Sequence, residues 1–230
     1  MMRHSSSIQR RHLSSPSAWI GTDESGKGDY FGPLVIGGVN VDSKIKKILE
    51  SLRVRDSKKI SDGVIKELDF RIRSSCIYSV VVIGPEKYNL LYLKMKNLNR
   101  MLAWGHARVI ENILMRVNCP RAVSDQFGNE LFIQNALLES GRKIKLEQRP
   151  HAEKDPGVAA ASVLARAEFL RRMARLSQQC GFDLPKGASP LVDDAARKVI
   201  DKFGKDALNR FVKLHFKNTL RLDVGSSPKN

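Results

Sequence analysis

The sequence predicts an α/β domain in which a mixed central β-sheet is flanked by helices, with a helical part toward the C-terminus. Two observations carry this prediction: β-rich apolar runs come first along the chain, and strand patterns then alternate with helical patterns. The chain has 230 residues, of which 42% are hydrophobic and 28% are charged. This is enough apolar material for one sizeable core, and no internal repeat or linker divides the body, so we expect a single domain.

Five segments predict strands because they are apolar or alternating runs bounded by turn residues. They cover residues 19–23, 32–41, 77–83, 121–124 and 143–148. The glycine-dense segment 25–28 separates the first two and predicts a structured turn. The third run is nearly continuous in β-branched and apolar residues, so it predicts a buried strand.

Helical periodicity predicts the remaining elements. Apolar residues recur on one face from Leu98 to Val117, and Asp62 can cap the helix that it begins. Pro156 occupies a position that a helix accepts in its first turn, and Gly204 ends a later helix. The predicted helices cover residues 45–52, 62–74, 97–117, 131–138, 157–176, 190–204 and 206–216.

The net charge of the chain indicates a polyanionic partner. Forty Lys and Arg residues against 24 Asp and Glu residues give +16, and the pI is near 10.0. Nucleic acid is the commonest partner of so positive a protein, although a merely soluble, positive surface has the same composition. No apolar run approaches the roughly 20 residues of a membrane span, so we expect no membrane partner.

The two ends of the chain differ in composition from the body. Residues 1–17 hold six Ser, three Arg and no acidic residue, and they lack the apolar segment of a secretory signal. They predict a basic, disordered N-terminal arm, although organelle transit peptides share this composition. The arm carries +3, which leaves +13 on the rest of the chain. We expect the folded domain to cover residues 18–222 and a polar tail to cover 223–230.

Three cysteines, Cys76, Cys119 and Cys180, are present without a C-x-x-C spacing. An odd number of cysteines that lack this spacing argues against a disulfide scaffold and against a structural zinc site. It fits a reducing compartment, so we expect a cytoplasmic location.

Carboxylates stand where predicted strands end and where a predicted helix begins. Asp23 and Glu24 end the first strand, Asp125 follows the fourth strand, and Glu153 and Asp155 lie just before the fifth helix. Functional groups of open α/β sheets gather outside strand ends. Acids that meet there repel one another unless a divalent cation intervenes, and hard oxygen ligands select Mg²⁺ or Mn²⁺. Two such ions about 3.5–4 Å apart serve phosphodiester hydrolysis.

Each acid also has a structural interpretation. Asp155 directly precedes Pro156 and is better placed as a helix N-cap than as a metal ligand. Asp125 and Glu24 are also compatible with turn residues or surface ion pairs. From composition and spacing alone, a metal-dependent nuclease and a non-catalytic binding protein therefore both stay open.

The motifs of the chain resemble those of a known family. The run G-T-D-E-S-G-K-G-D-Y-F-G-P-L at residues 21–34 closely resembles the opening of the type 2 ribonucleases H. Its G-K-G variant looks like the ribonuclease HIII branch, because ribonuclease HII usually has G-R-G there. Further motifs match in the same order up to residue 216. They are D-S-K-K at 56–59, N-L-N at 97–99, L-A-W-G-H-A at 102–107, S-D-Q-F at 124–127, A-E at 152–153, V-A-A-A-S at 158–162, L-P-K-G-A-S at 184–189 and K-L-H-F at 213–216.

This resemblance implies a ribonuclease H-like fold and endonucleolytic hydrolysis of the RNA strand of RNA–DNA hybrids, which leaves 5′-phosphate and 3′-hydroxyl ends. It places the four metal-binding acids on Asp23, Glu24, Asp125 and Glu153. Ribonuclease HIII is similar in having Glu as the fourth acid, which favours Glu153 over Asp155. It further implies two Mg²⁺ or Mn²⁺ ions, no organic cofactor, and a monomer.

By the same resemblance, the turn at Ser25, Gly26, Lys27 and Gly28 contacts the 2′-hydroxyls that distinguish RNA from DNA. Glycines let a backbone approach a sugar closely. The structural alternative is a tight hairpin with a solvated lysine. Phosphate contacts are expected from Lys58, Lys59 and Lys186, whose alternative is a role as solvated surface charges.

Two departures from the family pattern bear on the substrate. Ribonuclease HIII proteins generally carry an N-terminal substrate-binding domain, and only about 20 residues precede the first motif, so we expect that domain to be absent. Ribonuclease HII carries a C-terminal tyrosine that stacks at an RNA–DNA junction, but all four tyrosines here precede residue 93. We therefore expect poor cutting at a single ribonucleotide. The alternatives to a ribonuclease HIII-like enzyme are ribonuclease HII-like activity and a catalytically silent nucleic-acid-binding protein.

Overall fold

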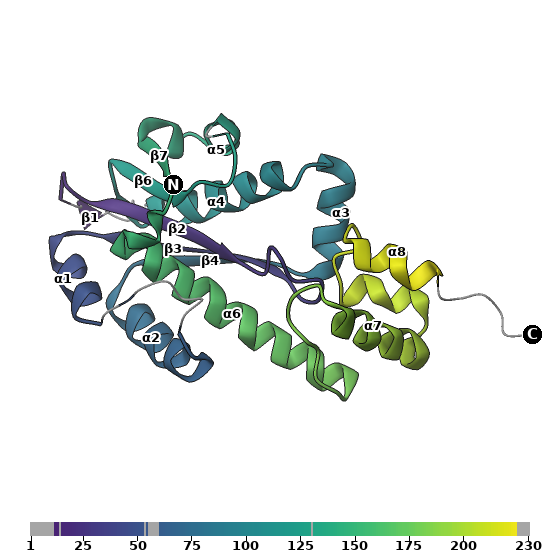
Figure 1. Ribbon diagram of the computed structural model, residues 1–230. Helices are drawn as coiled ribbons and strands as arrows, with labels where there is room; N and C mark the ends of the chain where they lie inside the picture. Colours follow the sequence, from purple (N-terminus) through teal and green to yellow (C-terminus); the bar gives the residue numbers. More distant parts are fainter. Residues whose placement is uncertain (1–11, 14, 53, 55–59, 130, 225–230) are drawn as a thin grey trace, which may run out of the picture.

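The computed structural model describes residues 12–13, 15–52, 54, 60–129 and 131–224. A central sheet has helices on both faces, and a group of helices lies beyond one end of the sheet (Figure 1). The mixed α/β fold expected from the sequence is confirmed. None of the described helices is long and apolar enough to cross a membrane.

In the described part of the chain, the central sheet has five strands in the spatial order β4, β3, β2, β6 and β7. β2 and β3 form an antiparallel hairpin, β4 extends it antiparallel, and β6 and β7 continue parallel to β2. Because β2 and β6 are parallel neighbours, their carboxyl ends open at one edge of the sheet. The strands are β2 (Trp19–Ser25), β3 (Leu34–Val41), β4 (Tyr78–Ile83), β6 (Arg121–Asp125) and β7 (Lys145–Arg149).

Helices cover the two faces of the sheet. α4 packs on one face, and α6 packs on the other together with α1 and α2 (Figure 1). The helices are α1 (Ser43–Ser51), α2 (Asp62–Ser75), α3 (Pro85–Met95), α4 (Leu98–Leu114), α5 (Leu131–Ala136), α6 (Pro156–Cys180), α7 (Pro190–Phe203) and α8 (Lys217–Val224). Shorter elements are the 3₁₀ helices η2 (Gly141–Lys143), η3 (Ala152–Lys154) and η4 (Lys205–Arg210), and the paired strands β1 (His12–Leu13) and β5 (Val117–Asn118).

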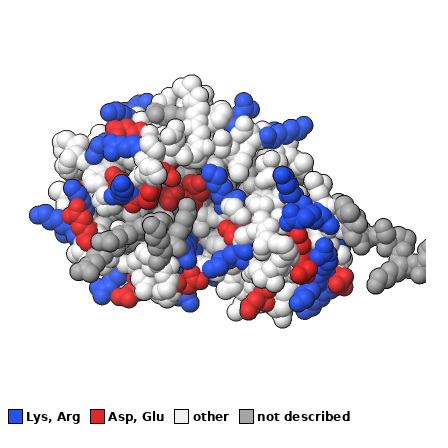
Figure 2. Space-filling view, viewed as in Figure 1, with Lys and Arg blue, Asp and Glu red and all other residues white. Residues whose placement is uncertain are grey.

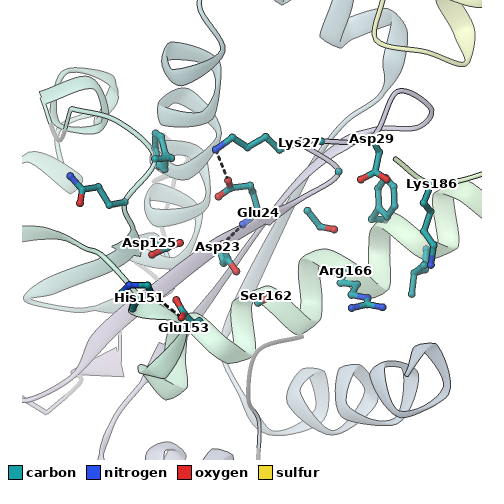
Figure 3. Close-up of a pocket in the computed structure, with 17 residues that line it drawn as sticks. Asp23, Glu24, Lys27, Asp29, Asp125, His151, Glu153, Ser162, Arg166 and Lys186 are labelled. Atoms are coloured by element: carbon teal, nitrogen blue, oxygen red, sulfur yellow. Dashed lines mark hydrogen bonds and ion pairs between the residues drawn. The ribbon is translucent and has the colours of Figure 1, made fainter. Parts of the chain in front are cut away.

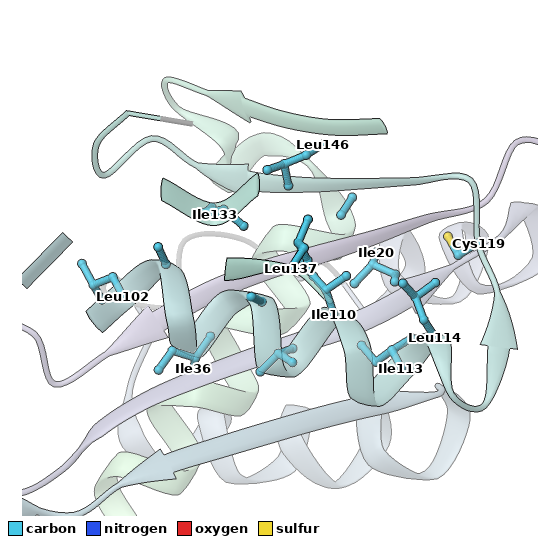
Figure 4. Close-up of a cluster of buried hydrophobic side chains, with 14 of the residues drawn as sticks. Ile20, Ile36, Leu102, Ile110, Ile113, Leu114, Cys119, Ile133, Leu137 and Leu146 are labelled. Atoms are coloured by element: carbon cyan, nitrogen blue, oxygen red, sulfur yellow. The ribbon is translucent and has the colours of Figure 1, made fainter. Parts of the chain in front are cut away.

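The core on the α4 face shows why these segments form these elements. Ile20 of β2 and Ile36 of β3 are completely buried and pack with Ile110 and Ile113 of α4 (Figure 4). Alternate residues of each strand reach this face, while the helix contributes residues three apart along one side. Burial of each such side chain stabilises the fold by roughly 1.5–3 kcal/mol. The core therefore fixes the β2–β3 hairpin rigidly against α4.

The start of α6 is fixed by a cap. The Asp155 carboxylate accepts hydrogen bonds from the backbone N–H groups of Gly157 at 2.8 Å and Val158 at 3.2 Å. The indole N–H of Trp19 donates to the same Oδ1 atom at 2.9 Å. The structural interpretation of Asp155 as an N-cap is thus confirmed, and the cap also ties α6 to the beginning of β2.

The C-terminal part packs around the turn that joins β2 to β3. Phe31 and Val212 form an antiparallel bridge. The N–H of Gly32 donates to the Phe211 carbonyl at 2.9 Å, and the N–H of Lys213 donates to the Tyr30 carbonyl at 2.8 Å. This backbone pairing accounts for one difference from the predicted elements, because segment 206–216 is not one helix but the end of η4 followed by the bridge at Val212 and a turn.

Three further details differ from the sequence-based expectations. The strand β4 lies at the edge of the sheet and most of its side chains are only partly buried, because it has a strand partner on one side alone. Helix α3, which begins at Pro85, was not expected. Ser61 occupies the N-cap position of α2, and the Asp62 side chain bonds to Arg166 and Lys186 instead.

Candidate active site

A cleft of about 890 Å³ opens at the edge of the sheet where β2 and β6 end (Figure 3). All four carboxylates expected from the motifs line it, although they come from three segments far apart in the sequence. Acidic side chains gather near the middle of one face of the molecule, with lysines and arginines around them (Figure 2). The residues lining the cleft are Asp23, Glu24, Ser25, Gly26, Lys27, Gly28, Asp29, Asp125, Gln126, Phe127, His151, Glu153, Ser162, Arg166, Phe169, Leu170 and Lys186.

Asp23 lies near the end of β2, where its Oδ1 accepts a hydrogen bond from the Glu24 backbone N–H at 2.8 Å. The pKa of Asp23 is raised to about 7, chiefly by burial and also by the neighbouring charges of Glu24 and Asp125. A carboxyl group that resists ionisation beside two other acids shows that like charges converge on this point. Such a point favours a cation.

Glu24 is held by two cationic or hydrogen-donating neighbours. Its Oε1 lies 3.5 Å from the Lys27 ammonium (Figure 3), and its Oε2 lies 3.3 Å from Nε2 of His106. Burial alone would raise the pKa of Glu24, but His106 and Lys27 outweigh it and hold the pKa below its ordinary value. Glu24 is therefore the ionised partner of the Asp23–Glu24 pair.

Asp125 and Glu153 are brought together by a tight connection between β7 and α6. Asp125 ends β6, and its Oδ1 accepts a hydrogen bond from the Ala152 N–H at 3.2 Å. Glu153 lies in η3, with Oε1 3.5 Å from Nδ1 of His151. His151 has a φ of 57°, which is unusual for a residue other than glycine. The turn at His151 thus directs η3 and its glutamate toward the end of β6.

The donor chemistry of the cleft fits a hard divalent cation. Four carboxylates face one cavity, and oxygen ligands are those that Mg²⁺ and Mn²⁺ prefer. Across the described ranges, no three His, Cys, Asp or Glu side chains lie close enough together to hold an ion as they stand. Each carboxylate instead makes the contact given above, so ion binding requires some of these side chains, but not all of them, to rotate within the cleft.

The turn expected to contact RNA lies on the wall of the same cleft. Ser25, Gly26, Lys27 and Gly28 all line it. Gly26 has a φ of 86°, and a Cβ there would stand 2.2 Å from the Pro33 carbonyl oxygen, so only glycine fits this backbone. The turn therefore presents backbone rather than side chains over part of its length.

Lys186 also lines the cleft and lies beside Arg166 (Figure 3). Asp62 bridges the two cations, with 2.9 Å between its Oδ1 and Nη2 of Arg166 and 3.3 Å between its Oδ2 and the ammonium of Lys186. This places the predicted phosphate contact at Lys186 on the cleft. The other two predicted contacts, Lys58 and Lys59, lie outside the described residues.

Sequence reasoning missed residues that act through long-range contacts. Asp29 accepts a hydrogen bond from the Gly187 N–H at 2.7 Å and so joins the glycine turn to the loop that carries Lys186. Lys213 is completely buried, and its ammonium donates to the carbonyls of Asp29 at 2.7 Å and Gly32 at 2.8 Å. For Lys213 the sequence held one signal of such a role, because this polar residue lies within the matched motif K-L-H-F.

A mixed sheet with helices on both faces and carboxylates at the ends of adjacent parallel strands defines a ribonuclease H-like α/β hydrolase. Residues 20–219 match the model of the family described as Ribonuclease HII. The chain belongs to this family. The family membership and the enzyme class expected from the motifs are thereby confirmed.

Similar proteins place the chain near the ribonuclease HIII branch. It is 43% identical over 198 residues to Ribonuclease HIII of Protochlamydia amoebophila, covering 86% of this chain and 66% of that protein. It is 44% identical over 201 residues to Ribonuclease HIII of Chlamydia felis, covering 86% and 67%. The crystal structure of Bst-RNase HIII in complex with Mn²⁺ superposes with a TM-score of 0.84 at 32% identity, covering 91% of this chain and 70% of that one. The chain thus spans about two thirds of the length of these curated relatives.

Proposed function

We propose that this chain is a ribonuclease HIII-type endonuclease that hydrolyses the RNA strand of RNA–DNA hybrids and leaves 5′-phosphate and 3′-hydroxyl ends. One observation carries the proposal: Asp23, Glu24, Asp125 and Glu153 come from three separate motifs and line one cleft. The glycine turn expected to contact 2′-hydroxyls forms a wall of that cleft. An acidic centre inside a chain of +16 suits a polyanionic substrate that must approach a carboxylate site.

The proposed cofactors are Mg²⁺ or Mn²⁺ ions held by the four carboxylates. Bound divalent ions supply the Lewis acidity that phosphodiester hydrolysis needs. The raised pKa of Asp23 supports this assignment, because a cation removes the repulsion that Glu24 and Asp125 exert on it. Bst-RNase HIII, which has the same fold, has been crystallised with Mn²⁺.

The chain itself binds and orients the substrate. We assign the backbone of Ser25–Gly28 to the ribose of the RNA strand, because a backbone turn can offer both donors and acceptors to a 2′-hydroxyl. We assign Lys186 to a phosphate, since it lies on the cleft with its ammonium partly exposed. Lys27, already paired with Glu24, keeps a positive charge beside the acids. We further propose that the enzyme acts as a cytoplasmic monomer without an organic cofactor.

Replacement of one acid tests the proposal directly. Asp125→Asn keeps the size of the side chain but removes its charge, so cleavage of a long RNA–DNA hybrid in Mg²⁺ or Mn²⁺ should fall by at least about a hundredfold while the fold is kept. Asp183→Asn, at an exposed acid that does not line the cleft, is the matched control and should cleave normally. Near-normal cleavage by the Asp125 variant would contradict the site assignment. Metal-dependent binding without any cleavage by the unaltered chain would favour the silent binding protein.

The second candidate function is ribonuclease HII-like cleavage at a single ribonucleotide, because the matching family model is described as Ribonuclease HII. The positions of the tyrosines oppose it. Tyr30 and Tyr88 are completely buried, and none of the four tyrosines lines the cleft. We therefore expect efficient cleavage of a long hybrid and poor cleavage of a DNA duplex that contains one ribonucleotide. The reverse preference would assign the ribonuclease HII-like activity.

A further inference from the structure

His106 of α4 is a completely buried histidine that faces polar atoms on both sides of its ring. Its Nδ1 lies 2.9 Å from the Thr22 hydroxyl, and its Nε2 lies 3.3 Å from Oε2 of Glu24. The ring also stacks on Phe127 with 4.8 Å between centroids, and Phe127 comes two residues after Asp125. One imidazole thus contacts β2 at two positions and the segment that follows β6.

The hydrogen on Nε2 follows from its neighbour. An ionised carboxylate can only accept hydrogen bonds, so Nε2 must be the protonated nitrogen if the two groups interact favourably. In the neutral ring Nδ1 is then an acceptor, and the Thr22 hydroxyl is the donor that satisfies it. Nε2 makes no hydrogen bond within the described residues, and the Glu24 carboxylate at 3.3 Å is the charged group that faces it. Thr22 and Glu24 therefore select the same tautomer of His106.

The two oxygens of Glu24 are held by partners of different mobility. Oε1 pairs with Lys27, whose side chain is 40% exposed, whereas Oε2 faces His106, which is 0% exposed. An exposed lysine on the wall of the cleft can exchange its partner when a polyanion enters. A buried imidazole that is fixed by a hydroxyl and an aromatic ring cannot move in this way. His106 is therefore the fixed point that orients the carboxylate.

We propose that His106, with Thr22 behind it, is a positioning residue that holds the Glu24 carboxylate in the orientation needed to bind the divalent cation. The inference rests on the proposed function, since it takes Glu24 as a ligand. Side chains that hold metal ligands by a hydrogen bond raise metal affinity by about ten- to hundredfold. A residue that merely filled space in the α4 core would not have this effect.

Metal affinity measured without substrate separates the two roles. We expect His106→Met, which keeps the bulk but removes the N–H, to bind Mn²⁺ about tenfold more weakly in calorimetry than the unaltered chain. His106→Gln, whose amide nitrogen can reach the same carboxylate oxygen, should restore the affinity to within about threefold. Equal Mn²⁺ affinity in a folded His106→Met variant, or no recovery in His106→Gln, would overturn the proposal.

Thr22→Val provides an independent variant if His106→Met does not fold. It removes the hydroxyl but keeps the shape, so the imidazole loses the partner that fixes its tautomer. We expect the variant to bind Mn²⁺ about threefold more weakly, because one orienting hydrogen bond is lost. Unchanged Mn²⁺ affinity would contradict the role given to Thr22. Failure of the proposed function looks different, because the unaltered chain would then bind Mn²⁺ without cleaving a hybrid.

Discussion

Gly21 of β2 and Gly157 of α6 lie against each other with no room for a side chain between them. A Cβ on Gly21 would stand 2.1 Å from the carbonyl carbon of Gly157. This contact brings the start of α6 next to the strand that carries Asp23, and η3 with Glu153 directly precedes that helix. The close approach of α6 to β2 therefore depends on the absence of a side chain at Gly21.

Gly21→Ala should consequently destabilise the protein. The methyl group meets backbone atoms that no rotamer change can move, so we expect a loss of about 1–3 kcal/mol in the free energy of unfolding. Gly63→Ala is the matched control, because a Cβ on Gly63 meets nothing within 4 Å and the residue lies in α2. The control should gain up to about 1 kcal/mol from helix propensity. Urea unfolding of the three proteins tests both, and equal stability of Gly21→Ala and the unaltered chain would refute the close contact.

Asp23 should make the metal-free protein less stable as the pH rises. Its pKa in the folded state is raised to about 7 from an ordinary 3.8, so the folded state holds a proton that the unfolded state releases. Stability from this group is present at low pH and is lost between pH 3.8 and about 7. Asp23→Asn lacks this loss of stability. The difference in the free energy of unfolding between the variant and the unaltered chain should therefore grow across that window to at most about 4 kcal/mol, at about 1.4 kcal/mol per pKa unit.

Urea unfolding in a chelator at pH 5 and pH 8 measures the Asp23 effect. Added Mn²⁺ should remove the advantage of Asp23→Asn at pH 8, because the ion neutralises the ionised carboxylates of the unaltered chain. A pH-independent difference between the two proteins would show that Asp23 titrates normally.

Lys213 should give the opposite pH dependence. Burial lowers its pKa to about 7 from an ordinary 10.5, and the Asp29 charge offsets this only in part. Between these pH values the unfolded state binds more protons than the folded state, so the contribution of Lys213 to stability rises with pH from about 7 to 10.5. Below pH 7 the cost of the buried ammonium is fully present.

Lys213→Met removes this titration together with the hydrogen bonds to Asp29 and Gly32. The bond loss shifts stability at every pH, so the informative quantity is the change in the difference between the two proteins. We expect the unaltered chain to gain on the variant between pH 7 and pH 9.5 in urea unfolding. Parallel curves over that range would mean that Lys213 keeps an ordinary pKa.

Lys186 should contribute to hybrid binding through charge alone. Lys186→Ala removes one phosphate contact, so KM for a long hybrid should rise at low salt and the logarithmic salt slope should fall by about 1, with little change in kcat. Lys198→Ala, at an exposed lysine on α7 that does not line the cleft, is the control of equal charge. If both variants raise KM equally, the effect belongs to net charge and the assignment of Lys186 fails.

Local signals in the sequence account for much of the fold. The apolar runs that became β2, β3 and β6 and the proline that opens α6 can be identified without tertiary information, because strand propensity and helix capping depend on neighbours in sequence. Asp155 illustrates this, since an acid before Pro156 predicted the cap that the structure contains. The sequence placed Asp23, Glu24 and Asp125 at predicted strand ends, and the family resemblance added Glu153 to this set; all four line one cleft.

Contacts between distant segments account for what could not be predicted. The segment 206–216 has helical periodicity, but residues 211–213 pair with residues 30–32, so the helix cannot continue there. His106 has the spacing of a core residue on α4, and nothing near it in sequence shows that Thr22 and Glu24 face its two nitrogens. Such roles depend on partners about eighty residues away, which periodicity does not encode.

The pairing between residues 30–32 and residues 211–213 has an evolutionary consequence. Residues 30–32, which follow the turn proposed to face the ribose, are bonded through their backbone to the C-terminal part. The buried ammonium of Lys213 also donates to the carbonyls of Asp29 and Gly32. Exchanging the glycine turn between relatives without exchanging its C-terminal partner would leave mismatched surfaces. Substrate preference in this family should therefore be inherited as a pair of segments, and chimeric enzymes need both to be functional.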